Sequence, residues 1–115
     1  MEDPQRKEAI SRVDTVLAAL AGPIPASEVA NGWNEHERLW WLDYFGELRR
    51  RIASGEPLAP KYRNVSILRG LDYRGITDYR GITSGEISEL AADVDIIVFD
   101  IVEKEDAISR WKNNA

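Results

Sequence analysis

Two segments in the first half of the chain carry apolar residues at helical spacing. In the first segment these positions are three and four residues apart: Ile10, Val13, Leu17 and Leu20. This spacing gives one apolar face on an α-helix. Asp3 suits the N-cap, Pro4 suits the first helical position, and Gly22 with the following proline is a stop signal. The pattern predicts a helix over 4–21.

A second helix is predicted over 34–54. Its apolar face repeats at spacings of four, three and four: Trp41, Phe45, Leu48 and Ile52. Asn34 is a suitable N-cap, and Glu37 follows three residues later, as in a capping box. Gly55 and two later prolines end the pattern. Between the two helices, a connector rich in proline and glycine predicts turns.

Residues 84–112 fit either one helix, or a strand at 94–102 followed by a terminal helix over 103–111. Their apolar positions are spaced by three, four and seven residues: Ile87, Leu90, Val94, Ile97, Ile101 and Ile108. A capping-box pattern at 83–86 also favours a helix. The stretch 94–102, however, is rich in β-branched residues and apolar nearly all round, which is typical of a buried strand. A strand needs partners, and the rest of the chain offers only 65–68. We therefore predict a helix, continuous or broken near Asp93 or Asp95, with Ile97 and Ile101 buried.

The stretch between these segments is harder to interpret. Residues 62–73 predict a third short helix, with a strand at 65–68 as the competitor. Two identical hexapeptides, Asp-Tyr-Arg-Gly-Ile-Thr, follow directly at 72–77 and 78–83. A period of six residues fits neither a continuous helical face nor a solenoid repeat. We interpret this tandem duplication as a surface loop at 72–83.

The predicted fold is an all-α, single-domain bundle of three to four helices over 1–115. The alternative is an α+β fold with a strand near 94–102. The length of 115 residues suits one domain, and hydrophobic residues at 43% are typical of a globular chain. The chain contains no cysteine, no secretory signal pattern and no apolar run long enough to span a membrane. We therefore expect a soluble, cytoplasmic protein without membrane attachment.

Charge is divided unevenly along the chain. The formal net charge is −5, which disfavours nucleic acid as a partner. Residues 49–80 nevertheless hold eight basic and three acidic side chains, whereas residues 86–106 hold eight acidic side chains and one basic. The two segments either face each other, or are solvated, or form a binding surface of one sign.

No catalytic or metal-binding pattern is present. Glu35, His36 and Glu37 are consecutive, so on a helix they point in different directions and cannot converge on one ion. His36 is the only histidine. Neither a phosphate-binding loop nor a nucleophile elbow occurs. We predict no cofactor and no metal, and no motif in the sequence identifies a reaction.

The remaining candidates are binding residues. Trp40 lies about 100° around the second helix from Trp41, so it is expected nearer to solvent. Seven side chains form the predicted binding set: Trp40, Arg49, Arg50, Tyr73, Arg74, Tyr79 and Arg80. Exposed Trp, Tyr and Arg carry much of the energy at protein interfaces.

These observations predict a non-catalytic protein–protein interaction module, such as an adaptor, inhibitor or regulator. Its partner is expected to be another protein, and a homo-oligomer is one form of this. The first alternative is a small nucleic-acid-binding module that uses the basic region 49–80, where aromatic and basic residues alternate. The second is a small enzyme whose carboxylates or tyrosines converge only in three dimensions.

Overall fold

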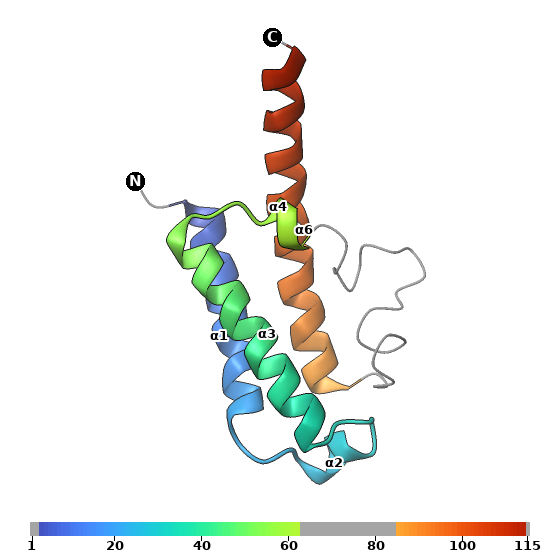
Figure 1. Cartoon of the computed structure of the whole chain (residues 1–115). Helices are drawn as coiled ribbons and strands as arrows, with labels where there is room; N and C mark the ends of the chain where they lie inside the picture. The colour runs from blue at the N-terminus through green and yellow to red at the C-terminus, as the bar shows by residue number, and fades with distance from the viewer. Residues whose placement is uncertain (1–2, 63–84, 115) are drawn as a thin grey trace.

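The computed structural model describes residues 3–62 and 85–114, and these residues form helices and no strand (Figure 1). The helices are α1 (Pro4–Ala21), α2 (Ala26–Val29), α3 (Glu35–Ser54), α4 (Ala59–Tyr62) and α6 (Glu86–Asn114). Three of them are long, and α2 and α4 are single turns. The all-α prediction is therefore confirmed. The predicted helix over 62–73 lies outside the described residues except for Tyr62, the last residue of α4, and the duplication at 72–83 lies outside them entirely.

Helix α1 makes the principal packing contacts of the bundle, because it lies against both α3 and α6. Its buried residues are Ala9, Val13, Val16 and Leu20. The sequence predicts Ile10 and Leu17 on the buried face, whereas both are only partly buried against the core. A helix packed between two others buries a wider face than a single stripe predicts, and the small side chain of Ala9 permits close approach.

Large apolar side chains from the other elements complete the core. On α3 the predicted face is confirmed, since Trp41, Phe45, Leu48 and Ile52 are all buried. The loops and α4 add four buried side chains: Trp33, Leu58, Ala59 and Tyr62. Helix α6 adds seven: Ile87, Ala91, Val94, Ile97, Val98, Ile101 and Val102.

The stretch 94–102 is helical, so the alternative strand is wrong, and α6 shows no break near Asp93 or Asp95. Ile97 and Ile101 are buried as predicted, with 5% and 4% of their surface exposed. The β-branched residues lower helix propensity only slightly. Packing against α1 outweighs that preference, which explains why composition alone was misleading here.

The predicted ends of α1 and α3 are confirmed, whereas α6 begins at Glu86 and ends at Asn114, each two residues later than predicted. Asp3 accepts hydrogen bonds from the backbone N–H groups of Gln5 and Arg6, at 2.9 and 3.4 Å. Asn34 accepts from the Glu37 N–H at 2.9 Å. Gly55 ends α3 with a φ of 82°, the left-handed conformation that glycine adopts without strain.

The start of α6 is capped by a residue from a distant helix. The Glu28 carboxylate, on α2, accepts a hydrogen bond from the Glu86 backbone N–H at 3.1 Å. Glu28 is 5% exposed, and a Cβ on Gly85 would lie only 3.0 Å from its carboxylate oxygens. A negative charge at the positive end of the α6 dipole is favourable. The short helix α2 therefore fastens the α1–α3 connector to α6.

Replacing Glu28 with alanine is expected to destabilise the fold by about 1–2 kcal/mol, the usual cost of losing a helix cap. Ser27→Ala is the matched control, because Ser27 is the adjacent, exposed residue of the same helix. Urea denaturation followed by circular dichroism measures both free energies of unfolding. Equal stabilities of the two variants would contradict the capping role.

A second long-range connection joins four segments at the opposite end of the bundle. The Arg6 guanidinium donates to the carbonyl oxygens of Ile52 and Glu56, at 3.2 and 3.0 Å, and to Glu105 Oε2 at 3.2 Å. Glu105 in turn accepts from the backbone N–H groups of Leu58 and Ala59, at distances from 2.8 to 3.0 Å. The Arg6–Glu105 pair therefore caps the end of α3 and the start of α4 while holding α1 to α6.

Candidate protein-binding surface

Trp40 is partly exposed, and its ring packs against other aromatic side chains of α3. Its exposed fraction is 37%, and its ring stacks on that of Tyr44, with centroids 5.8 Å apart and planes 11° apart. It also meets the edge of Trp41 at 4.7 Å. Trp40 thus extends an aromatic cluster from the core to the surface of α3.

The inner part of this cluster is structural. Tyr44 contacts Trp41, Phe45 and Tyr62, with ring centroids between 5.1 and 5.9 Å apart. Burial raises the pKa of the Tyr44 phenol well above its ordinary value, and the charge of Asp95 raises it further. Burial raises the pKa of Tyr62 to about 12, with a further contribution from Glu47. Both phenols therefore stay protonated near neutral pH.

The predicted arginines form ion pairs within the chain. Arg49 Nε lies 2.6 Å from Asp14 Oδ1 on α1. Arg50 donates to both oxygens of Glu47, at 2.8 and 3.0 Å, and to Glu56 at 3.0 Å. These basic side chains are therefore paired with acids of α1, α3 and the following loop.

Trp40 and the two arginines do not form one patch. Nine positions separate Trp40 from Arg49, which places them on opposite sides of α3, about 180° apart. Arg50 lies about 15 Å further along the helix axis than Trp40. The other predicted binding residues, Tyr73, Arg74, Tyr79 and Arg80, lie outside the described residues.

The pairing of Glu47 predicts a titration at unusually low pH. Hydrogen bonds from Arg50, followed by the charges of Arg50 and Lys61, lower its pKa to about 2. The folded-state pKa is depressed, so the stabilising contribution is fully present above the ordinary pKa and is lost as pH falls through about 2. Side-chain NMR titration measures this value directly.

Arg50→Gln is expected to return the Glu47 pKa toward its ordinary range. Arg12→Gln is the matched control, because Arg12 pairs with Glu8 on α1 in a similar exposed ion pair. A Glu47 pKa that is normal in the unaltered protein, or insensitive to Arg50→Gln, would show that the ion pair does not persist in solution.

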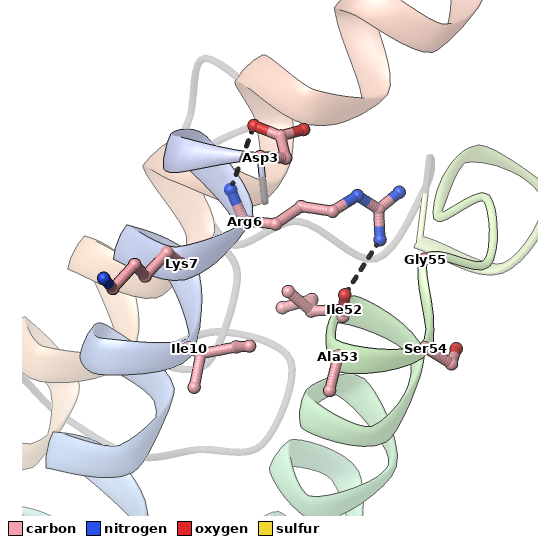
Figure 2. Close-up of a pocket in the computed structure, with 8 residues that line it drawn as sticks. All are labelled: Asp3, Arg6, Lys7, Ile10, Ile52, Ala53, Ser54 and Gly55. Carbon is pink, nitrogen blue, oxygen red and sulfur yellow. Dashed lines mark hydrogen bonds between the residues drawn. The ribbon is translucent and has the colours of Figure 1, made fainter. Parts of the chain in front are cut away.

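A hollow of about 560 Å³ lies between the first turns of α1 and the last turn of α3 (Figure 2). Asp3, Arg6 and Lys7 are its charged residues. Figure 2 shows Asp3 accepting from the Arg6 backbone and the Arg6 guanidinium directed at the Ile52 carbonyl. Two of the three charged groups thus serve as helix caps, and the hollow offers no acid–base pair poised for catalysis.

A second hollow, of about 450 Å³, lies where α4 and the loop before it meet α6. Pro57, Ala59 and Pro60 line one side of it. The α6 side consists of Glu105, Asp106, Ile108, Ser109 and Lys112. The depression is open. Its α4 side is apolar, and its α6 side is mostly polar and charged.

The C-terminal end of α6 extends past α1 and α3, as Figure 1 shows, and α4 lies against its base. We call residues 103–114 the α6 tip. Among the described side chains of this helix, up to Lys112, Val102 is the last buried one. Beyond it, Ile108 is 55% exposed and Trp111 is 71% exposed. The tip spans about 18 Å at 1.5 Å per residue.

Sequence reasoning placed Ile108 in the apolar pattern but missed the α6 tip as a surface. The available signal was helix length. The C-terminal helix has 29 residues and α1 has 18, so α6 is longer than α1 by about 16 Å. Part of α6 therefore has to extend beyond the length that α1 can cover.

The described residues hold no group of three histidine, aspartate or glutamate side chains that could bind a metal ion. Within the same ranges, no helix is long and apolar enough to cross a bilayer. No protein-family model, curated protein or solved structure matches the chain with significance. The functional argument therefore rests on the geometry of the molecule.

Proposed function

We propose that this chain is a non-catalytic protein-recognition module, of the adaptor, inhibitor or regulator type, that binds its partner through the α6 tip. One observation carries the proposal: Ile108 and Trp111 are largely exposed on a helical extension that projects beyond α1 and α3. Exposed large apolar side chains grouped on one element are typical of interaction sites.

The α6 tip is suited to binding because its base is held rigidly. Glu105 connects the first turn of the tip to α1 and α4 through Arg6, Leu58 and Ala59. A surface that is already ordered loses less conformational entropy on association than a disordered one. Tryptophan is also enriched among the residues that contribute most to interface energy.

Trp40 is the weaker anchor of the two exposed tryptophans. It is 37% exposed, compared with 71% for Trp111, and it already stacks on Tyr44. Removing Trp40 would disturb the fold as well as any interface. Arg49 and Arg50 would have to exchange their present partners, Asp14 and Glu47, for groups of another protein.

Comparative capture tests the proposal. The immobilised full chain and its Trp111→Ala variant are exposed to an extract of cells that express the protein, and bound proteins are identified by mass spectrometry. We expect partners that the unaltered chain retains and the Trp111→Ala variant loses. Calorimetry with the purified partner should then show a loss of about 2 kcal/mol or more in binding free energy.

Leu39→Ala is the control variant, because Leu39 is 53% exposed on α3, away from the α6 tip. It should capture the same proteins as the unaltered chain. Circular dichroism melts check that both variants remain folded. Capture that survives Trp111→Ala but fails with Leu39→Ala or Trp40→Ala would move the binding surface to α3.

A further inference from the structure

We propose that the α6 tip binds the α6 tip of a second copy of this chain, as an antiparallel helix pair related by a two-fold axis. The inference rests on the proposed function, since it requires the tip to be a binding surface. It identifies the binding partner as a second copy of the chain. Three observations support it: the heptad spacing of the tip, the distribution of charge along it, and the hollow at its base.

The apolar stripe of α6 continues into the tip with a seven-residue period. Val94, Ile101 and Ile108 are each seven residues apart, and Trp111 lies fourteen residues after Ile97. Val94, Ile97 and Ile101 are buried in the bundle, whereas Ile108 and Trp111 are exposed. Lys104 interrupts the stripe between Ile101 and Ile108, and Ile108 and Trp111 then resume the three-residue spacing that packs one helix along another.

An antiparallel arrangement gives both exposed residues, Ile108 and Trp111, an apolar packing partner at once. If Ile108 packs against Trp111 of the second copy, the two-fold axis places Trp111 against Ile108 of that copy. Both contacts are reciprocal, so the interface closes at two chains. A parallel pair would instead place the two Trp111 side chains at the same level.

Charge along the tip also favours the antiparallel direction. Residues 103–106 comprise three acids and one lysine, and the only charged residues in 107–114 are Arg110 and Lys112. Two antiparallel copies therefore align an acidic segment with a basic one. With Ile108 opposite Trp111, the flanking Lys112 of one copy lies close to Glu105 of the other, because both residues occupy the same flank of the stripe.

The hollow beside Ile108 gives the indole of the second copy room to pack. Its volume of about 450 Å³ exceeds that of one tryptophan side chain, and Pro57, Ala59 and Pro60 supply apolar contact on its far side. Lys112 and Glu105 lie on its wall. A flat helix surface alone would leave most of a second copy's Trp111 in water.

The interface is small, so the association is expected to be weak and reversible. Two large apolar side chains from each copy bury far less than the roughly 1,200 Å² of stable, standard-sized interfaces. Sedimentation of the full chain from micromolar to millimolar concentration should show the mass rising from 13.0 kDa toward twice that value. Trp111→Ala and Ile108→Ala should each weaken self-association by about tenfold or more.

A pair of charge reversals tests the direction of the helices. Lys112→Glu places a like charge near Glu105 of the second copy and should weaken association by about threefold, more at low salt. Arg110→Glu makes the same change in net charge but lies about 160° around the helix from Ile108. It should weaken association less than Lys112→Glu does, because Arg110 does not flank the apolar stripe, and circular dichroism confirms that all variants fold.

A chain that remains monomeric throughout this range would overturn the inference. So would a dimer that is insensitive to both Trp111→Ala and Ile108→Ala, because its interface would lie elsewhere. A dimer that Lys112→Glu leaves unchanged or strengthens would overturn the antiparallel arrangement. A monomer that captures other proteins through Trp111 would retain the proposed function while excluding the second copy as occupant.

Discussion

Ile97→Ala is expected to lower the free energy of unfolding by about 2–5 kcal/mol, the range for truncating a buried aliphatic side chain. Ile97 is 5% exposed on the face of α6 that belongs to the core. The cost combines lost burial of three carbon atoms with a cavity that rigid neighbours fill only in part. Denaturant titration followed by circular dichroism measures the change.

Ile96→Ala makes the same chemical change one position earlier. Ile96 is 45% exposed, because consecutive residues of a helix point about 100° apart. Its truncation should cost less than about 1 kcal/mol, since surface substitutions rarely have large effects. Comparable costs for the two variants would mean that α6 is rotated about its axis in solution relative to this packing.

The long helices could be predicted because their signals are local. Asp3 and Asn34 cap helices through atoms two or three residues away, and Gly55 ends α3 through its own backbone conformation. The apolar period of α6 likewise indicates a helix without reference to the rest of the chain. The strand alternative arose from composition, which ignores that period.

Connections between distant residues could not be predicted in the same way. Glu28 and Glu86 are 58 positions apart, and Arg6 and Glu105 are 99 positions apart. Each of these side chains looks like an ordinary surface charge in the sequence. Only the packing of α2 and α4 against α6 brings the carboxylates to the helix ends that they cap.

The candidate site was predictable only in part, for a related reason. The triple arginine of α3 suggested an exposed basic surface, but Arg49 and Arg50 find acids on α1, α3 and the loop before α4. Pairing between segments is invisible to a local charge count. The exposure of Trp111 depends equally on where α1 begins and α3 ends relative to α6.

Glu105→Ala is expected to destabilise the protein by about 2–4 kcal/mol. The change removes the acceptor for the Leu58 and Ala59 backbone N–H groups and for the Arg6 guanidinium. The Arg6 and Glu105 side chains are only 17% and 22% exposed, so water replaces these hydrogen bonds poorly. Unsatisfied, partly buried donors cost more than the average hydrogen bond contributes.

Asp100→Ala is the matched control, because it removes an exposed carboxylate from the same helix and should change stability by less than about 0.5 kcal/mol.

The double variant Arg6→Ala with Glu105→Ala then shows whether the two side chains stabilise the fold together or independently. Because each residue stabilises its segment partly through the other, the double variant should cost less than the sum of the single variants, by about 1–2 kcal/mol. Strict additivity in denaturant titrations would show that Arg6 and Glu105 act separately. In that case the base of the α6 tip would be held by the α4 backbone contacts alone, and the tip would be less rigid than its proposed role in binding requires.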